Sequence, residues 1–201
     1  EPAIIRDQLA EYYGMISHMD DQVGRILQAL IESGRIENTY IIYTADHGLA
    51  VGSHGLLGKQ SLYEHSMGTP MIIAGPGIPE GKSSDALVYL LDLFPTIAQL
   101  ADVPLPKGVE GKSLVPIMHG TSTGVRESLF TTYEKYMRAV TDGRWKLIRY
   151  PHINYTQLFD LKIDPDEMTN LAERPEQERR VERMLALLED WQKRTDDKTP
   201  L

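Results

Sequence analysis

The residues with the clearest chemical potential are Asp46, His47 and Lys59, which lie in one short segment of the chain. Asp46 offers an anionic oxygen and His47 a ring nitrogen, and both are common metal ligands. Lys59 offers a compact positive charge that suits an anionic oxygen, particularly where negative charge develops during a reaction. Together these residue types could hold a metal ion beside an anionic group.

The elements around these residues are those that would position them. Residues 40–43, with the sequence YIIY, predict a buried strand. Asp46 and His47 follow its carboxyl end, the place where open α/β sheets bind their ligands. Glycines at 48, 52, 55 and 58 then allow a tight loop that can approach a ligand closely. His54 lies in this loop, where it could donate to a substrate oxygen, protonate a leaving group or order the loop.

Several motifs, in this order and spacing, resemble the sulfatase family, a branch of the alkaline-phosphatase superfamily. The resemblance covers most of the chain, and no single motif decides it. The motifs are TADHG at 44–48, GSHGLLGK at 52–59, YE at 63–64, Pro70, GPG at 75–77, DLFPT at 92–96, GKSL at 111–114 and the signature from Leu158 to Leu171.

The resemblance implies metal-dependent hydrolysis of a sulfate ester such as an aryl sulfate. Asp46 and His47 resemble the paired metal ligands of that family, and Lys59 resembles the lysine that contacts the sulfuryl group. Many relatives carry asparagine in place of His47. An all-oxygen site would favour calcium, whereas a histidine ligand favours manganese, zinc or another transition metal, so calcium, manganese, zinc and magnesium all stay open. Lys59 and His54 are the candidate catalytic residues.

Other parts of the family's site are absent from this sequence. The nucleophile in sulfatases is a formylglycine made from Cys or Ser in a Cys/Ser-x-Pro/Ala-x-Arg motif. The chain has no cysteine, and none of its serines fits the motif. Asp20 and Asp21 do not replace the family's upstream Asp pair, because they lie within a predicted helix. We therefore expect the C-terminal portion of a sulfatase, which lacks the N-terminal part of the same protein and is inactive alone.

Two other functions stay open from the sequence. A phosphonate or phosphate ester hydrolase of the same superfamily could use the same metal, lysine and nucleophile, although the C-terminal signature favours the sulfatase. A non-catalytic interaction module is the alternative from another class, since an incomplete sheet would expose an edge to a partner.

Composition excludes several classes of function and leaves the compartment open. The net charge of −8 and the lack of a basic stripe argue against a nucleic-acid partner. No apolar run is long enough to span a bilayer. The absence of cysteine excludes disulfides and thiolate metal sites. By resemblance, the bacterial periplasm, the cytoplasm and the secretory pathway are all compatible locations.

In the first part of the chain, residues 1–127, the pattern predicts α/β structure. Apolar residues at helical spacing predict a helix over 12–33, which Gly34 ends. Strands are expected at 70–74 and 85–91. Asp92 is expected to cap a helix over 93–101. Residues 102–127, rich in Gly and Pro, predict a surface connection and a domain boundary.

Residues 128–201 predict a separate subdomain of antiparallel strands and one helix. Strand patterns cover 129–133, 138–141, 145–150 and 157–161, with a two-residue hairpin at Asp142-Gly143. Residues 175–193 predict a helix, and the tail after Thr195 is expected to fray. The predicted fold is thus α/β: a partial alkaline-phosphatase-like α/β/α sheet, then a small antiparallel sheet with a C-terminal helix.

Overall fold

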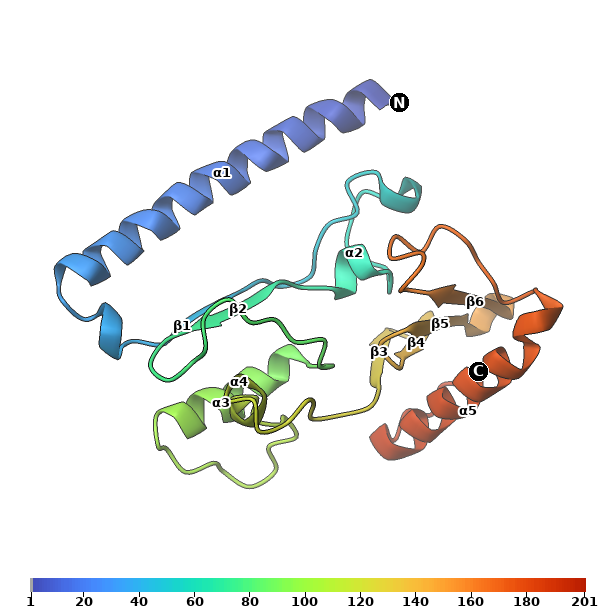
Figure 1. The fold of residues 1–201 in the computed structure, drawn as a ribbon. Coiled ribbons are helices and arrows are strands. Elements are labelled where there is room, and N and C mark those ends of the chain that lie inside the picture. The colour runs from blue at the N-terminus through green and yellow to red at the C-terminus, as the bar shows by residue number, and fades with distance from the viewer. Residues whose placement is uncertain (1) are drawn as a thin grey trace. The chain divides into compact units, whose positions relative to one another are not determined.

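The computed structural model describes residues 2–201 (Figure 1). The chain divides into two compact units. One unit comprises the chain up to Gln60 together with His65–Glu80. The other comprises Ser61–Glu64 and Gly81–Leu201. The family-based division into 1–127 and 128–201 stays a prediction. None of the described helices is both long enough and apolar enough to cross a membrane.

The first unit begins with the long helix α1, which runs from Pro2 to Glu32. It starts earlier than the predicted residue 12, because proline is tolerated in a helix's first turn and the residues that follow are compatible with a helix. Gly34 ends it as predicted, with a positive φ of 68°. The helix leaves large apolar side chains exposed: Ile4, Tyr13, Met15, Ile16, Met19, Ile26 and Ile31.

Two short antiparallel strands follow, β1 (Ile41–Thr44) and β2 (Met71–Ala74), and they confirm both predicted strands to within one residue. The 3-10 turn η1 (Ile36–Asn38) leads into β1. Gly75 ends β2 at a φ of 148°, where a Cβ atom would lie 2.6 Å from the ring of Tyr40. Only glycine therefore fits at this position.

The second unit opens with the 3-10 turn η3 (Leu90–Asp92) and the helix α3 (Leu93–Leu100). The predicted strand at 85–91 is wrong. This segment runs without regular structure into η3, and no strand in the described part of the chain pairs with it. Apolar character alone cannot make a strand that lacks a neighbour to hydrogen-bond with.

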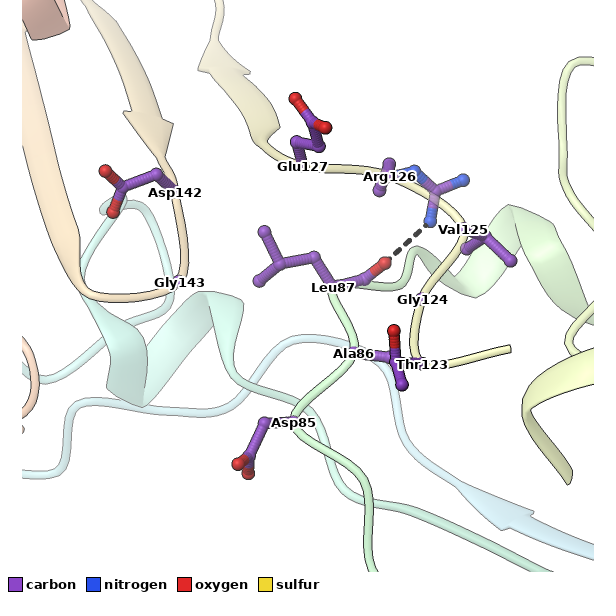
Figure 2. Close-up of a pocket in the computed structure, with 10 residues that line it drawn as sticks. All are labelled: Asp85, Ala86, Leu87, Thr123, Gly124, Val125, Arg126, Glu127, Asp142 and Gly143. Carbon is purple, nitrogen blue, oxygen red and sulfur yellow. Dashed lines mark hydrogen bonds between the residues drawn. The ribbon is translucent and has the colours of Figure 1, made fainter. Parts of the chain in front are cut away.

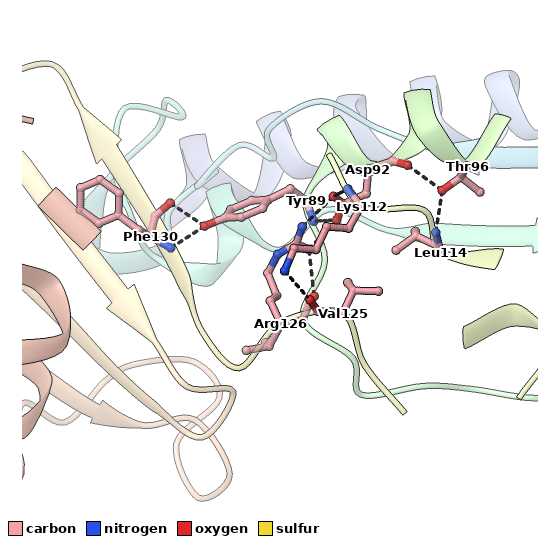
Figure 3. Close-up of polar contacts among 9 residues, drawn as sticks. Tyr89, Asp92, Thr96, Lys112, Leu114, Val125, Arg126 and Phe130 are labelled. Carbon is pink, nitrogen blue, oxygen red and sulfur yellow. Dashed lines mark hydrogen bonds and ion pairs between the residues drawn. The ribbon is translucent and has the colours of Figure 1, made fainter. Parts of the chain in front are cut away.

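The carboxylate of Asp92 ties this region together, as Figure 3 shows. Asp92 is the N-cap residue of α3, as predicted, but its carboxylate makes no capping hydrogen bond to that helix. Instead it accepts hydrogen bonds from Arg126 Nη2 at 2.7 Å, from the Lys112 N–H at 2.8 Å and from the Tyr89 N–H at 2.7 Å. Burial acts to raise the pKa of Asp92, but these hydrogen bonds outweigh it and the net pKa is lowered. The connection from 102 to 127, which includes the short helix α4 (Val115–Met118), is thereby anchored at two points.

A four-stranded antiparallel sheet forms the rest of the second unit. Its strands lie in sequence order: β3 (Leu129–Tyr133), β4 (Met137–Thr141), β5 (Trp145–Tyr150) and β6 (Tyr155–Asp160). A 3-10 turn, η4 (Pro151–Ile153), joins the last two strands. After a second such turn, η5 (Pro175–Gln177), helix α5 (Glu178–Thr195) packs on the sheet. The buried core comprises Val140, Trp145, Leu147, Leu158, Met184 and Leu188. The α/β class and this sheet-and-helix arrangement confirm the predicted fold.

Two local predictions in this subdomain need correction. The β4–β5 hairpin is displaced by one residue: Asp142 pairs with Trp145, so Gly143 and Arg144 make the turn. The tail after Thr195 is not frayed. Asp197 accepts a 2.5 Å hydrogen bond from Nε of Arg138, whose side chain is almost fully buried. A buried guanidinium needs a counter-charge, and the tail supplies it.

Candidate functional site

The loop that follows β1 reverses direction and lies against itself. The Ala50 N–H donates to the Gly58 carbonyl at 3.0 Å, and the Gly52 N–H donates to the Leu56 carbonyl at 2.7 Å. The tip is a 3-10 turn, η2 (Ser53–Gly55). Because its two arms run side by side, the loop returns Lys59 to the start of the segment, beside Asp46.

Lys59 and Asp46 form an ion pair. Nζ of Lys59 lies 3.0 Å from Oδ2 of Asp46, and both side chains are open to solvent. The pKa of Asp46 is lowered, first by a hydrogen bond from the His47 backbone N–H and then by Lys59. The carboxylate therefore stays ionised in neutral solution, as a metal ligand must.

His47 is oriented by a backbone carbonyl. Its Nδ1 lies 3.1 Å from the Ser66 carbonyl oxygen, which can only accept, so Nδ1 carries the proton in this hydrogen bond. Nε2 is then left with a free lone pair when the ring is neutral. It lies 4.0 Å from Oδ1 of Asp46. Metal-binding histidines usually donate their other ring N–H to a backbone carbonyl or a carboxylate, as His47 does to Ser66. Asp46 and His47 therefore fit a divalent metal in residue type and in the orientation of the His47 ring.

Ser66 belongs to the one-turn helix α2 (Glu64–Met67), against which the loop packs closely. A Cβ atom on Gly48 would lie 2.1 Å from the His65 carbonyl oxygen, so only glycine allows this approach. The Gly48 N–H in turn donates to the Ser66 carbonyl at 3.3 Å.

His54 lies at the loop tip with a φ of 53°, a left-handed conformation that is uncommon for residues other than glycine. Its ring is 5.6 Å from that of His65. The structure thus brings Asp46, His47 and Lys59 together and places His54 at the turn between the loop's arms. No three acidic or histidine side chains among residues 2–201 gather as a metal site.

A charge cluster of Glu64, Lys146 and Glu167 lies in the second unit, with Lys146 and Glu167 buried and Glu64 partly exposed. Nζ of Lys146 is 2.7 Å from Oε1 of Glu64 and 2.9 Å from Oε1 of Glu167. Burial raises the pKa of Glu167 even though Lys146 acts to lower it. Glu64 thus has a basic side chain as its partner. Lys146 was missed, because a lysine in a strand usually faces water.

A pocket of about 530 Å³ lies elsewhere in the second unit, and Figure 2 shows its lining. Segments 85–87, 123–127 and 142–143 surround it, and Arg126 donates there to the Leu87 carbonyl at 3.1 Å. None of the predicted site residues lines it.

Comparison with known proteins identifies the family. The model of a family described as "N-sulphoglucosamine sulphohydrolase, C-terminal" matches residues 52–194. This chain belongs to the sulfatase family. The match includes Lys59, His54 and all of the Glu64–Lys146–Glu167 cluster, whereas Asp46 and His47 precede it.

Individual sulfatases are similar over most of the chain. Arylsulfatase K of Xenopus laevis is 32% identical, over 94% of this chain and 38% of its own length. The structure of BT4656 with its substrate, D-glucosamine-2-N,6-O-disulfate, superposes with a TM-score of 0.82 and 30% identity, over 90% of this chain and 39% of that one. The chain thus spans about two fifths of the length of these sulfatases.

A phosphonate monoester hydrolase from Silicibacter pomeroyi is also similar. Its structure superposes with a TM-score of 0.78 at 26% identity, over 90% of this chain and 40% of that one. Sulfatases and a phosphonate hydrolase therefore share this fold.

Proposed function

We propose that this chain is the C-terminal part of a sulfatase that hydrolyses a sulfate ester with the help of a divalent metal ion. The observation that carries the proposal is the convergence of Lys59 Nζ and His47 Nε2 on the Asp46 carboxylate, at 3.0 Å and 4.0 Å. It occurs in a chain of the sulfatase family, and it joins two metal-ligand types to one cation at a solvent-open site.

Each residue has a distinct role in this proposal. Oδ1 of Asp46 and Nε2 of His47 would hold the metal ion, whether calcium, manganese, zinc or magnesium. When bound, such an ion would neutralise negative charge on the ester's oxygens. The ammonium group of Lys59 would bind a non-bridging sulfate oxygen and stabilise the charge that develops there. His54 would donate a hydrogen bond to a substrate oxygen or protonate the leaving group.

The nucleophile is proposed to come from the rest of the protein. The 201 residues contain no cysteine and no serine in the formylglycine motif. Two protein ligands are also too few to fix a metal for catalysis. The chain alone is therefore expected to hydrolyse no ester, with or without added metal.

Hydrolysis of a phosphonate monoester is the second candidate, and the likeness to the Silicibacter pomeroyi enzyme favours it. A lysine and a metal ion can stabilise phosphoryl transfer as they do sulfuryl transfer. Nothing in the geometry of Asp46, His47 and Lys59 selects sulfur over phosphorus.

Parallel assays of the full-length protein test the proposal. We expect kcat/KM for an aryl sulfate to exceed that for a matched aryl phosphonate monoester. Activity should be lost with a chelator and restored by one of the four metals. A preference for the phosphonate would support the second candidate, and no hydrolysis of either ester would contradict both.

A further inference from the structure

Ser66 of α2 contacts both arms of the loop over residues 45–59, which we call the site loop. Its side chain is completely buried. Its hydroxyl lies 2.7 Å from the Lys59 carbonyl oxygen and 3.1 Å from the Gly48 carbonyl oxygen. Its own carbonyl accepts from His47 Nδ1 at 3.1 Å and from the Gly48 N–H at 3.3 Å.

We infer that Ser66 is a positioning residue that holds His47 and Lys59 in one fixed arrangement. The inference deepens the proposed function and rests on it. Ser66 acts through the ring of His47 and the backbone of Lys59, the two residues that would contact metal and substrate.

The carbonyl and the hydroxyl of Ser66 restrain different residues. The carbonyl selects the ring tautomer of His47, so that Nε2 rather than Nδ1 presents a lone pair on the side of Asp46. The hydroxyl carries one proton and has two acceptors within reach, with the shorter contact to Lys59. It therefore fixes the backbone of Lys59 relative to that of Gly48, and hence the distance between the cation and the predicted metal ligands.

The loop's backbone hydrogen bonds, such as that from the Ala50 N–H to the Gly58 carbonyl, join its arms to each other, whereas Ser66 joins both arms to α2. Val51, Gly52, His54 and Gly55 all adopt positive φ, and the ion pair between Lys59 and Asp46 is solvent-exposed. Exposed ion pairs hold their geometry weakly, whereas a buried hydroxyl cannot exchange its partners for water.

Metal titration of the full-length, metal-stripped protein tests the inference with a matched pair of variants. Ser66→Ala removes only the buried hydroxyl. Thr96→Val removes an equally buried hydroxyl in the other unit, one that donates to the Asp92 carbonyl and accepts from the Leu114 N–H. Both variants should lower the thermal midpoint. Only Ser66→Ala should weaken binding of Mn²⁺ or Ca²⁺, by about 10- to 100-fold.

Equal metal affinity in Ser66→Ala and wild type would overturn the inference. A second measurement covers a variant that does not fold: the ¹⁵N spectrum of the wild-type His47 ring, assigned by comparison with His47→Asn. At a pH where the ring is neutral and metal is absent, we expect Nδ1 to be protonated. A ring protonated at Nε2 would overturn the inference.

These outcomes are separable from those of the proposed function. Neither readout uses ester hydrolysis, so an inactive protein would refute the proposed function alone. If the wild type bound neither Mn²⁺ nor Ca²⁺, the metal proposal would fail, and the histidine spectrum would still decide whether Ser66 orients the ring.

Discussion

Lys146 holds its positive charge inside the second unit, with a side chain only 3% exposed. We predict that Lys146→Met in the full-length protein lowers the free energy of unfolding by roughly 3–5 kcal/mol at neutral pH, because two carboxylates lose their shared partner. Urea denaturation would measure the loss, with the exposed Lys107→Met as the control.

The pH dependence of that loss follows from Glu167, whose pKa is raised in the folded state. Its contribution to stability is present at low pH, where it is protonated, and is lost as the pH rises through the raised pKa. Without Lys146 the ionised form is penalised further. The cost of Lys146→Met should therefore be smaller in mildly acidic buffer than at neutral pH, and a larger cost in acid would contradict the assignment.

Gly48 has no room for a side chain. We predict that Gly48→Ala costs roughly 1–3 kcal/mol, because its Cβ would push the loop away from α2. It should also weaken metal binding by displacing His47. Gly24→Ala in α1, where nothing lies within 4 Å of the added Cβ, should instead stabilise by about 0.5–1 kcal/mol. A pair of unfolding curves would show these opposite signs, and equal effects would disprove the close approach.

At the scale of elements, the chain's C-terminal tail contributes an ion pair that stabilises the sheet. Asp197, whose pKa is lowered chiefly by the hydrogen bond from Arg138, gives β4 its counter-charge. We predict that Asp197→Asn lowers the unfolding free energy by about 3 kcal/mol at neutral pH. The neighbouring Asp196, which is exposed, is the matched control, and Asp196→Asn should leave stability unchanged.

Unfolding measurements at low pH test whether the charge of Asp197 accounts for this stabilisation. A carboxylate with a lowered folded pKa contributes stability above its unfolded pKa and loses it as the pH falls through the folded value. The difference in unfolding free energy between wild type and Asp197→Asn should therefore become smaller as the pH falls. A gap that stayed constant across that range would show that Asp197 acts without its charge.

Sequence reasoning succeeded where local pattern decides the structure. The strands at 129–133 and 145–150 alternate or run apolar between clear turn residues, and both formed where predicted. Sequence reasoning failed where a side chain's contacts depend on a residue far away in the sequence. Asp92 was predicted to cap a helix because the residues after it are helical. Its carboxylate instead binds Arg126, which lies far away in the sequence. The anchored tail and the buried Lys146 were missed for the same reason.

The candidate site shows the same limit. The types of Asp46, His47 and Lys59 could be read from the sequence, and the loop's glycines indicated a tight turn. Ser66 gave no signal, because its role depends on a buried hydroxyl between two loop arms. A serine in a short polar helix is ordinary, and only the packing of Gly48 against α2 gives this one a role.

At the scale of the whole molecule, the chain spans about two fifths of its relatives, such as Arylsulfatase K of Xenopus laevis. The first unit displays an apolar face on α1, with Tyr13, Met19 and Ile26 exposed. The catalytic proposal accordingly concerns the full-length protein, in which Asp46, His47 and Lys59 would complete a site begun elsewhere in the chain.

The most direct test is kcat/KM for an aryl sulfate in full-length Lys59→Met, with metal content measured on the same samples and the exposed Lys82→Met as control. If Lys59 stabilises the transferring group, kcat/KM should fall about 10²- to 10³-fold while metal content and the Lys82→Met control stay unchanged. Wild-type kcat/KM in Lys59→Met would contradict the placement of the sulfate group beside Asp46 and His47.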